Sequence, residues 1–376
     1  MNNTIGIYIH IPFCNSKCFY CDFYSECNND KVEEYINALC EEILQNAEIL
    51  ENKIIDTVYF GGGTPSSIDS KYILKIMDVI KLFPNDIKEA TIEVNPESVT
   101  DEKLNDYKNA GINRISIGLQ SINNSTLKKI GRIASKEDFQ NAYNLIVKEG
   151  FKNISLDIIT GLPVESINDF KNTIDFVLSL KNITHISSYS LEVHENTKLD
   201  FLLNNGFLML PSEDDERNMK YLLDKKLNEN GFLRYEISNY SKIGFESKHN
   251  LRYWNQEEYL GFGAAASSFL NSTRYSNISD INTYILNINR GISNTCKIEE
   301  MDIDDLISEY IILRLRLKDG VIFEEFKDRF KIDFYSKYKE KIDELTKKGL
   351  LIKTNYNIYL SNKGEDLANI VWQEFI

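Results

Sequence analysis

The stretch IGIYIHIPFCNSKCFYC spans residues 5–21 and joins an apolar segment to three closely spaced cysteines. Its first half, residues 5–12, is apolar and rich in β-branched residues, which is typical of a buried strand. Cys14, Cys18 and Cys21 follow within one short loop. The sequence therefore predicts a buried first strand with a group of thiols directly after it.

The alternation of strand and helix continues along the first two thirds of the chain. We expect strands at residues 5–12, 56–60, 90–94, 114–119, 153–159 and 185–191, and helices at 30–50, 70–82, 101–110, 136–149, 167–180 and 214–230. This order predicts a parallel sheet covered by helices. Polar residues and glycines gather where five of the strands end, as in barrels, whereas a doubly wound sheet concentrates its site at one switch point. We predict an α/β fold with a partial (β/α)6 barrel.

The strand–helix alternation ends near residue 235, and a compact C-terminal region begins near residue 297. We predict a core barrel at 1–235, a connecting segment at 236–296 and a C-terminal module at 297–376. Helices expected at 304–317, 323–330 and 334–348, with a hairpin at 350–360, predict a winged-helix-like α+β module. The module holds 17 Asp and Glu against 14 Lys and Arg. Because modules that read DNA are normally basic, we expect it to dock a protein or a substrate.

Composition narrows the class of protein. The net charge is −14, which disfavours nucleic acid as a partner. No apolar run approaches the roughly 18 residues of a membrane span, and the N-terminus lacks the features of a signal peptide. Six cysteines in 376 residues are too few for a disulfide scaffold and favour a metal or cluster site in a reducing compartment. We therefore expect a cytoplasmic protein, with peripheral membrane contact left open.

Two motifs carry the chemistry. Three thiolates on a four-iron cluster leave one iron open to a small molecule, although a structural zinc site with a fourth ligand is the alternative. Gly61-Gly62-Gly63-Thr64-Pro65 follows the second strand and lets the backbone approach a ligand closely, although a tight turn would also use glycine. A phosphate loop is disfavoured because no Gly-Lys-Ser/Thr follows.

The spacing CxxxCxxC, with Tyr20 before the third cysteine, resembles the radical-SAM superfamily. The resemblance implies a [4Fe–4S] cluster on Cys14, Cys18 and Cys21, and S-adenosylmethionine (SAM) bound to the open iron by its amino and carboxylate groups. It also implies an electron donor for the cluster. One electron would cleave the sulfonium into methionine and a 5′-deoxyadenosyl radical.

Further motifs resemble the family of oxygen-independent coproporphyrinogen III dehydrogenase and the related HemW heme chaperones. They are YIHIPFC (8–14), IEVNP (92–96), SIGLQS (116–121), IGR (130–132) and DIITGLP (157–163). The resemblance implies SAM contacts from Tyr8, Tyr20, Gly62 and Glu93. It also implies that a place for a second SAM in the dehydrogenase is lined by Gly63, Thr64, Gln120, Arg132 and Asp157. An internal ion pair is the alternative for Glu93, and a solvated surface charge is the alternative for Arg132.

Two features favour the chaperone branch. The dehydrogenase has a fourth cysteine two places after the third and a longer N-terminal arm, whereas Phe23 stands at that place here and only 13 residues precede Cys14. Residues 249–254 read HNLRYW and resemble the chaperones' HNxxYW motif. This resemblance implies heme bound through His249, with Asn250, Tyr253 and Trp254. By itself, a histidine beside aromatic residues is usually a packing residue; we expect His185 and His194 to be structural.

The leading hypothesis is a chaperone that delivers heme to heme-requiring, including respiratory, proteins. The alternatives are coproporphyrinogen III dehydrogenase, which decarboxylates propionates, and a radical-SAM enzyme with another substrate. The sequence leaves open whether SAM is cleaved and whether the chain forms a homodimer.

Overall fold

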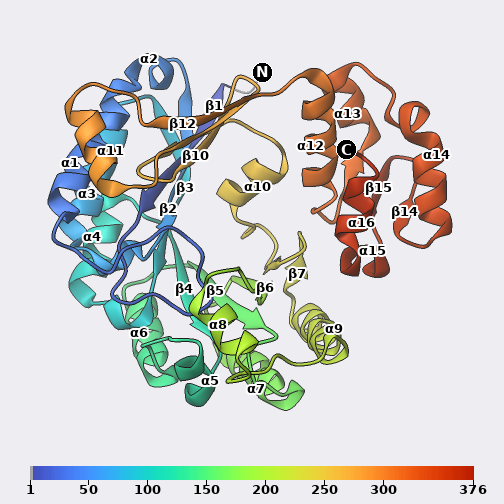
Figure 1. The fold of residues 1–376 in the computed structure, drawn as a ribbon, viewed down its shortest axis with the longest axis horizontal. Helices are drawn as coiled ribbons and strands as arrows, with labels where there is room; N and C mark the ends of the chain where they lie inside the picture. The colour runs from blue at the N-terminus through green and yellow to red at the C-terminus, as the bar shows by residue number, and fades with distance from the viewer. Residues whose placement is uncertain (1–2) are drawn as a thin grey trace.

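The computed structural model describes residues 3–376, which are organised around one large curved sheet (Figure 1). The strand order is β12-β11-β10-β9-β1-β2-β3-β4-β5-β6-β8-β7. The central strands β1 to β6 are parallel neighbours in chain order. The edge strands β12 and β7 do not pair with each other, so the barrel is open. The predicted α/β fold with a partial barrel is confirmed.

The six predicted strand–helix units are present. The strands are β1 (Thr4–Ile11), β2 (Ile54–Gly62), β3 (Asn85–Val94), β4 (Arg114–Gln120), β5 (Asn153–Thr160) and β6 (His185–Ser190). The helices that follow them are α1 (Val32–Gln45), α3 (Ser70–Ile80), α4 (Asp101–Ala110), α6 (Lys136–Lys148), α7 (Ile167–Ser179) and α9 (Glu213–Glu229). The helix predicted at 30–50 is divided into α1 and the short α2 (Ala47–Leu50), and the short helices α5 (Asn124–Lys129) and α8 (Lys198–Asn204) add to the predicted set.

Alternation along β1 explains which side chains reach the inside of the barrel. Ile5, Ile7, Ile9 and Ile11 are fully buried in the main hydrophobic core, which also includes residues of α1 and α3. Successive side chains of a strand point to opposite faces, so the even-numbered Tyr8 and His10 face the other way. The inner face can therefore carry polar residues while the outer face builds the core.

The segment predicted to connect two parts contributes to the same sheet. Beside β6, the sheet continues with β8 (Asn239–Ser241) and then β7 (Leu233–Arg234). Beside β1 it continues with β9 (Tyr259–Phe262), β10 (Ser267–Leu270), β11 (Thr273–Asn277) and β12 (Thr295–Glu300). Helices α10 (Lys248–Trp254) and α11 (Ile281–Asn289) lie between these strands in sequence. Strands this short show too few alternations to be recognised in sequence.

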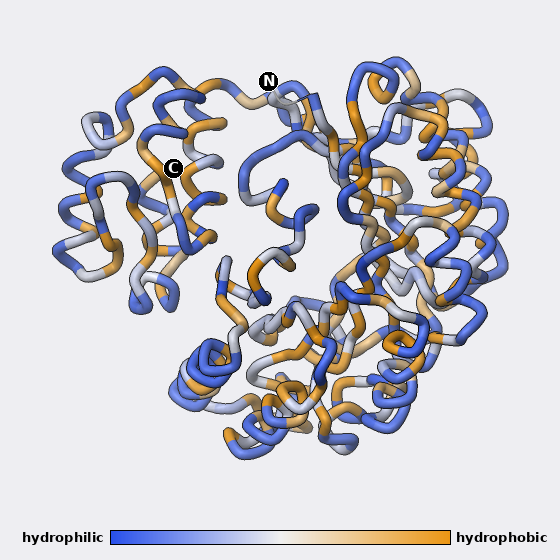
Figure 2. Tube along the Cα trace, turned by 180° about the vertical axis from the view of Figure 1, so that it is seen from behind, coloured by the Kyte–Doolittle hydropathy of each residue, from blue (hydrophilic) through white to orange (hydrophobic). Residues whose placement is uncertain are grey.

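The C-terminal module has its own hydrophobic core, from Ile307 to Phe375 (Figure 2). Its elements are α12 (Ile303–Arg314), β13 (Val321–Ile322), α13 (Phe323–Phe330), α14 (Phe334–Lys347), β14 (Leu351–Lys353), β15 (Asn357–Leu360), α15 (Asn362–Asp366) and α16 (Ala368–Gln373). The predicted three helices and hairpin are present, and β13 completes a three-stranded sheet. Within residues 3–376, no helix combines the length and apolar character needed to cross a bilayer.

A short joint holds this module against the barrel. Ile237 donates its backbone N–H to Arg316, and Lys318 donates its own to Tyr235. The carboxylate of Glu365 pairs with Arg234 at 2.7 Å and also with Lys318. Because the joint combines backbone hydrogen bonds with ion pairs, it sets the position of α15 and α16 relative to the barrel.

Candidate functional site

A cavity of about 890 Å³ opens at the carboxyl ends of the parallel strands. Most of the predicted cluster and SAM residues line it: Cys14, Cys18, Tyr20, Cys21, Gly62, Gly63, Thr64, Glu93, Gln120, Arg132 and Asp157. They come from the ends of β2 to β5 and from the loops that follow β1, β2 and α5. Ligand cavities usually measure about 300–1,000 Å³, so this volume suits a ligand of cofactor size.

The cysteine loop faces this cavity. Cys14 is 8% exposed, while Cys18 and Cys21 are half-buried. The thiol of Cys14 lies 3.4 Å from Thr64 Oγ1, and Arg132 Nη1 donates to the Cys18 thiol at 3.8 Å. Three soft thiol donors around one cavity, with a cation beside them, fit the ligand set of an iron–sulfur cluster. The three thiols line one cavity but are not drawn together closely enough to hold a single metal ion, and within residues 3–376 no other group of three His, Cys, Asp or Glu side chains is either.

Burial affects the protonation of the cysteine ligands. It raises the pKa of the Cys14 thiol and raises that of Cys21 to about 11. Both thiols are therefore neutral near pH 7 when no iron is bound. Bound iron favours the thiolate, so assembly of a cluster here would release protons.

The glycines after β2 are required by close packing as well as by the cavity. Gly62 has φ +105°, and a Cβ there would lie 2.5 Å from the His10 ring. A Cβ on Gly63 would lie 2.8 Å from the Phe13 carbonyl oxygen, directly before the cysteine loop. Both glycines also line the cavity. The loop therefore brings bare backbone against β1 and against the space where a ligand can bind.

Glu93 and Tyr59 form a part-buried pair on the inner face of the sheet. The Tyr59 hydroxyl donates to Glu93 Oε1 at 2.7 Å. Burial raises the pKa of Glu93 to about 7, and nearby Asp157 adds to the rise. Glu93 forms no ion pair among the contacts of residues 3–376, although the charge of Arg114 lowers its pKa. A carboxyl that titrates near neutrality at a cavity is a candidate ligand-binding group.

The remaining predicted polar residues sit on β4, on β5 and after α5. The Ser116 hydroxyl donates to Asp157 at 3.2 Å, and burial raises the pKa of Asp157. Arg132 donates to the Gly118 carbonyl oxygen at 3.1 Å and is part-buried at the cavity, so the alternative of a solvated surface charge is wrong. Gln120 has φ +64°, an unusual conformation for a residue with a side chain, and it too lines the cavity.

Tyr8 lies beside the site, although it does not line the cavity formed by residues 3–376. Its hydroxyl is 3.1 Å from His10 Nδ1, and its ring stacks on Tyr59 with centroids 6.3 Å apart. Tyr8 therefore contacts the residue that holds Glu93.

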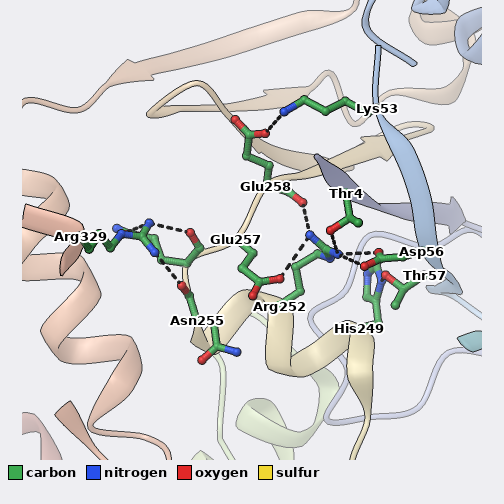
Figure 3. A network of polar contacts seen from close by, with 11 residues as sticks. Thr4, Lys53, Asp56, Thr57, His249, Arg252, Asn255, Glu257, Glu258 and Arg329 are labelled. Carbon is green, nitrogen blue, oxygen red and sulfur yellow. Dashed lines mark hydrogen bonds and ion pairs between the residues drawn. The ribbon is translucent and has the colours of Figure 1, made fainter. Parts of the chain in front are cut away.

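The predicted heme motif lies on α10, which packs against β2 and α12 (Figures 1 and 3). His249 is fully buried, and its two ring nitrogens are 2.9 Å from Thr57 Oγ1 and 2.8 Å from the Tyr253 hydroxyl. Its ring stacks on Tyr59 at 5.3 Å. Burial lowers the pKa of His249 to about 3, so the ring is neutral, which is the form that can ligate a metal.

Helix α10 is held from several directions. Buried Glu89 accepts hydrogen bonds from the backbone N–H groups of Lys248 and His249. Arg252, 3% exposed, pairs with Asp56 and donates to the Glu258 carbonyl oxygen at 3.1 Å (Figure 3). None of His249, Asn250, Tyr253 and Trp254 lines the cavity formed by residues 3–376. The structure thus separates the heme motif from the cluster and SAM residues.

Several residues that line the cavity were not predicted from the sequence to belong to the site. Tyr189 lies near the end of β6 and His194 lies beyond it. Arg316 and Trp372 belong to the C-terminal part of the chain. The position of Tyr189 at a strand end could have indicated its place. Nothing in the local sequence could have placed Arg316 or Trp372, because they reach the cavity only through the joint. His194, expected to be structural, is 38% exposed and lies 3.4 Å from Asp22.

Two protein-family models match separate parts of the chain and together cover most of its length. Residues 8–177 match the Radical SAM superfamily, and residues 301–367 match the HemN C-terminal domain. Heme chaperone HemW of Lactococcus lactis is 36% identical and is aligned over 98% of this chain and 96% of its own. Heme chaperone HemW of Bacillus subtilis is also 36% identical, with 98% of both chains covered.

Among solved structures, coproporphyrinogen III oxidase (HemN) from Escherichia coli, a radical SAM enzyme, superimposes with a TM-score of 0.86. The superposition covers 100% of this chain and 90% of that chain, at 20% sequence identity. At this identity the likeness establishes the shared fold.

Proposed function

The chain belongs to the family of the heme chaperone HemW within the radical SAM superfamily, and from this we propose that it binds heme and delivers it to heme-requiring proteins. The main structural support is the cavity, where three thiols and buried polar groups from successive strands meet. The geometry suits a protein that carries a cluster and SAM.

We infer that Cys14, Cys18 and Cys21 hold a [4Fe–4S] cluster. When bound, such a cluster would supply one electron to the sulfonium of SAM. Glu93 and Asp157 can accept hydrogen bonds from the ammonium and hydroxyl groups of SAM, and Arg132 can pair with a carboxylate. An electron donor is then a partner of the protein. Whether SAM is cleaved during heme transfer is a separate question, which product analysis would answer.

Heme ligation by His249 requires a local rearrangement. Both ring nitrogens contact hydroxyl groups, and the ring is covered by Tyr59 and Tyr253. Iron can reach the ring only after the contact with Tyr253 breaks and α10 moves away from β2. We propose that heme is loaded through such an opening, with Asn250, Tyr253 and Trp254 beside the ligand.

The test is a heme titration of anaerobically reconstituted protein, followed by its Soret absorption. We expect the wild type to bind heme and His249→Ala to lose the ligated spectrum. His194→Ala is the matched histidine control, because His194 lines the cavity without belonging to the motif. A spectrum lost in His194→Ala and kept in His249→Ala would move the iron ligand to the cavity.

The cluster is tested on the same preparations. Replacing Cys14, Cys18 and Cys21 together by serine should abolish the absorption and paramagnetic signal of the reconstituted cluster. Cys296→Ser is the control, because Cys296 is exposed on β12. Wild-type protein that takes up no heme would remove the proposal, and conversion of coproporphyrinogen III to protoporphyrinogen would favour the dehydrogenase instead.

A cytoplasmic location and heme-accepting partner proteins are part of the proposal. Free thiols in the cluster loop are consistent with a reducing compartment. Nucleic acid remains an unexpected partner because the chain is acidic. Membrane contact and a homodimer are open to measurement by vesicle flotation and by light scattering.

A further inference from the structure

Arg316 has no hydrogen-bond partner for its guanidinium among residues 3–376. Its Nη2 lies 3.6 Å from Glu236, beyond hydrogen-bond length, and its Nε is buried without a partner. The side chain is 25% exposed and lines the cavity. A buried or part-buried guanidinium normally uses its donors on carboxylates or carbonyl oxygens. Arg316 therefore has donors available for a ligand.

Two aromatic rings hold this guanidinium. Its carbon lies 4.3 Å from the Trp254 ring centroid and 5.8 Å from that of Trp372. Trp254 is the last residue of the HNLRYW motif on α10, and Trp372 lines the cavity. Arg316 is thus the residue that connects the motif helix to the cavity.

The cavity wall near Arg316 exposes large apolar side chains among its polar ones. Leu367 and Ile370 line the cavity and are 38% and 50% exposed, although they are large hydrophobic residues. The wall carboxylates already have partners: Glu365 pairs with Arg234 and Lys318, and Asp366 accepts from the Tyr221 hydroxyl at 3.1 Å. Exposed apolar side chains beside a guanidinium that pairs only with Glu236, at 3.6 Å, and makes no hydrogen bond within residues 3–376 suit a flat apolar ring that carries a carboxylate.

We propose that Arg316 is the carboxylate-binding group of the heme site: it pairs with a propionate while the ring edge lies against Leu367, Ile370 and Trp372. This assignment rests on the proposed heme-binding function and adds a binding group outside the HNLRYW motif. It places the heme carboxylates at the cavity, on the side of α10 that carries Trp254.

The test compares two arginines of the same joint. Arg316→Gln should weaken hemin binding about tenfold, the usual effect of losing one charge-assisted contact. Arg234→Gln breaks the pair with Glu365 in the same joint, but Arg234 does not line this cavity within residues 3–376. Its hemin affinity should stay within about twofold of the wild type, because Lys318 still pairs with Glu365 and the backbone hydrogen bonds still hold the joint.

A ligand without free carboxylates separates pairing from packing. Hemin dimethyl ester should bind Arg316→Gln and wild type equally, because the ester cannot form the ion pair. Arg316→Lys keeps the charge and should bind hemin with intermediate affinity; it also serves if the glutamine variant does not fold. SAM affinity should be unchanged in Arg316→Gln.

Four results overturn the assignment. They are equal hemin affinity in Arg316→Gln and wild type, equal weakening in both arginine variants, the same weakening with the ester, and a loss that affects SAM instead of hemin. Absence of hemin binding by the wild type is a different result, since it removes the proposed function itself.

Discussion

Gly62 shows at the scale of one residue why the loop after β2 contains glycine. Gly62→Ala places a methyl group 2.5 Å from His10 in a left-handed conformation of φ +105°. We expect it to lower the free energy of unfolding by about 3 kcal/mol, from backbone strain and overpacking together. Urea unfolding followed by circular dichroism measures this loss.

Gly150→Ala separates the two causes. Gly150 also has a positive φ, +89°, but a Cβ there would meet no atom within 4 Å. Gly150→Ala should therefore lower the free energy of unfolding by the backbone strain alone, about 1 kcal/mol. If both variants lost the same free energy, contact with His10 would not be the reason for glycine at position 62.

Glu93 should make SAM binding depend on pH. Its pKa is raised to about 7, so in the free protein the carboxylate is present above that pH and lost below it. If the carboxylate accepts hydrogen bonds from SAM, affinity should fall about tenfold per pH unit below pH 7 and level off above it. Equilibrium dialysis with reconstituted protein measures the affinity.

Two variants check that Glu93 is the titrating group. Glu93→Gln should remove the pH dependence. Tyr59→Phe removes the hydrogen bond that lowers the Glu93 pKa, so it should move the midpoint to higher pH. An unchanged midpoint in both variants would assign the pH dependence to another group.

At the scale of elements, α10 depends on Arg252 for its position inside the barrel. Arg252→Ala leaves Asp56 without its partner and should cost about 3 kcal/mol of unfolding free energy. Amide hydrogen exchange should also speed up along residues 248–254, because α10 is no longer held at β1 and β2. Exchange followed by mass spectrometry detects this local opening.

Lys148→Ala is the control for Arg252→Ala, because it also removes a cation from an ion pair. Lys148 pairs with Asp101 on the surface and is 69% exposed, so its removal should cost under about 0.5 kcal/mol. Equal costs for the two variants would mean that Arg252 does not anchor α10.

At the scale of the whole molecule, two hydrophobic cores meet at the joint that contains Glu365. Glu365→Gln weakens its pairs with both Arg234 and Lys318. We expect the module to separate from the barrel at a lower urea concentration, at a cost of about 2 kcal/mol. The chain's two tryptophans, Trp254 and Trp372, both contact Arg316 at the joint, so their emission reports its opening.

Glu344→Gln on the exposed face of α14 is the control for this variant. Its partner Lys348 lies on the same helix end, so the joint is unaffected. A fluorescence midpoint that did not change in Glu365→Gln would show that the backbone hydrogen bonds at 235–237 and 316–318 hold the module by themselves.

Local patterns were enough to predict the barrel and most of its site. The period of each strand and helix predicted the barrel, and the motifs put the predicted cluster and SAM residues near the strand ends, where all of them except Tyr8 line one cavity within residues 3–376. Their binding roles stay predictions. The short strands between residues 239 and 300 were missed, because segments of three to six residues carry no clear period. Their pairing depends on neighbours far away in the sequence.

By itself, the sequence determined the order of strands and helices, the thiol loop after β1 and the glycines beside it. These follow from backbone geometry and from spacing within a few residues. Only the tertiary structure decided that His249, on α10, is enclosed against β2 and that Arg316 and Trp372 line the cavity. Such placements depend on which distant segments pack together, and burial and charge at those contacts are properties of the assembled fold.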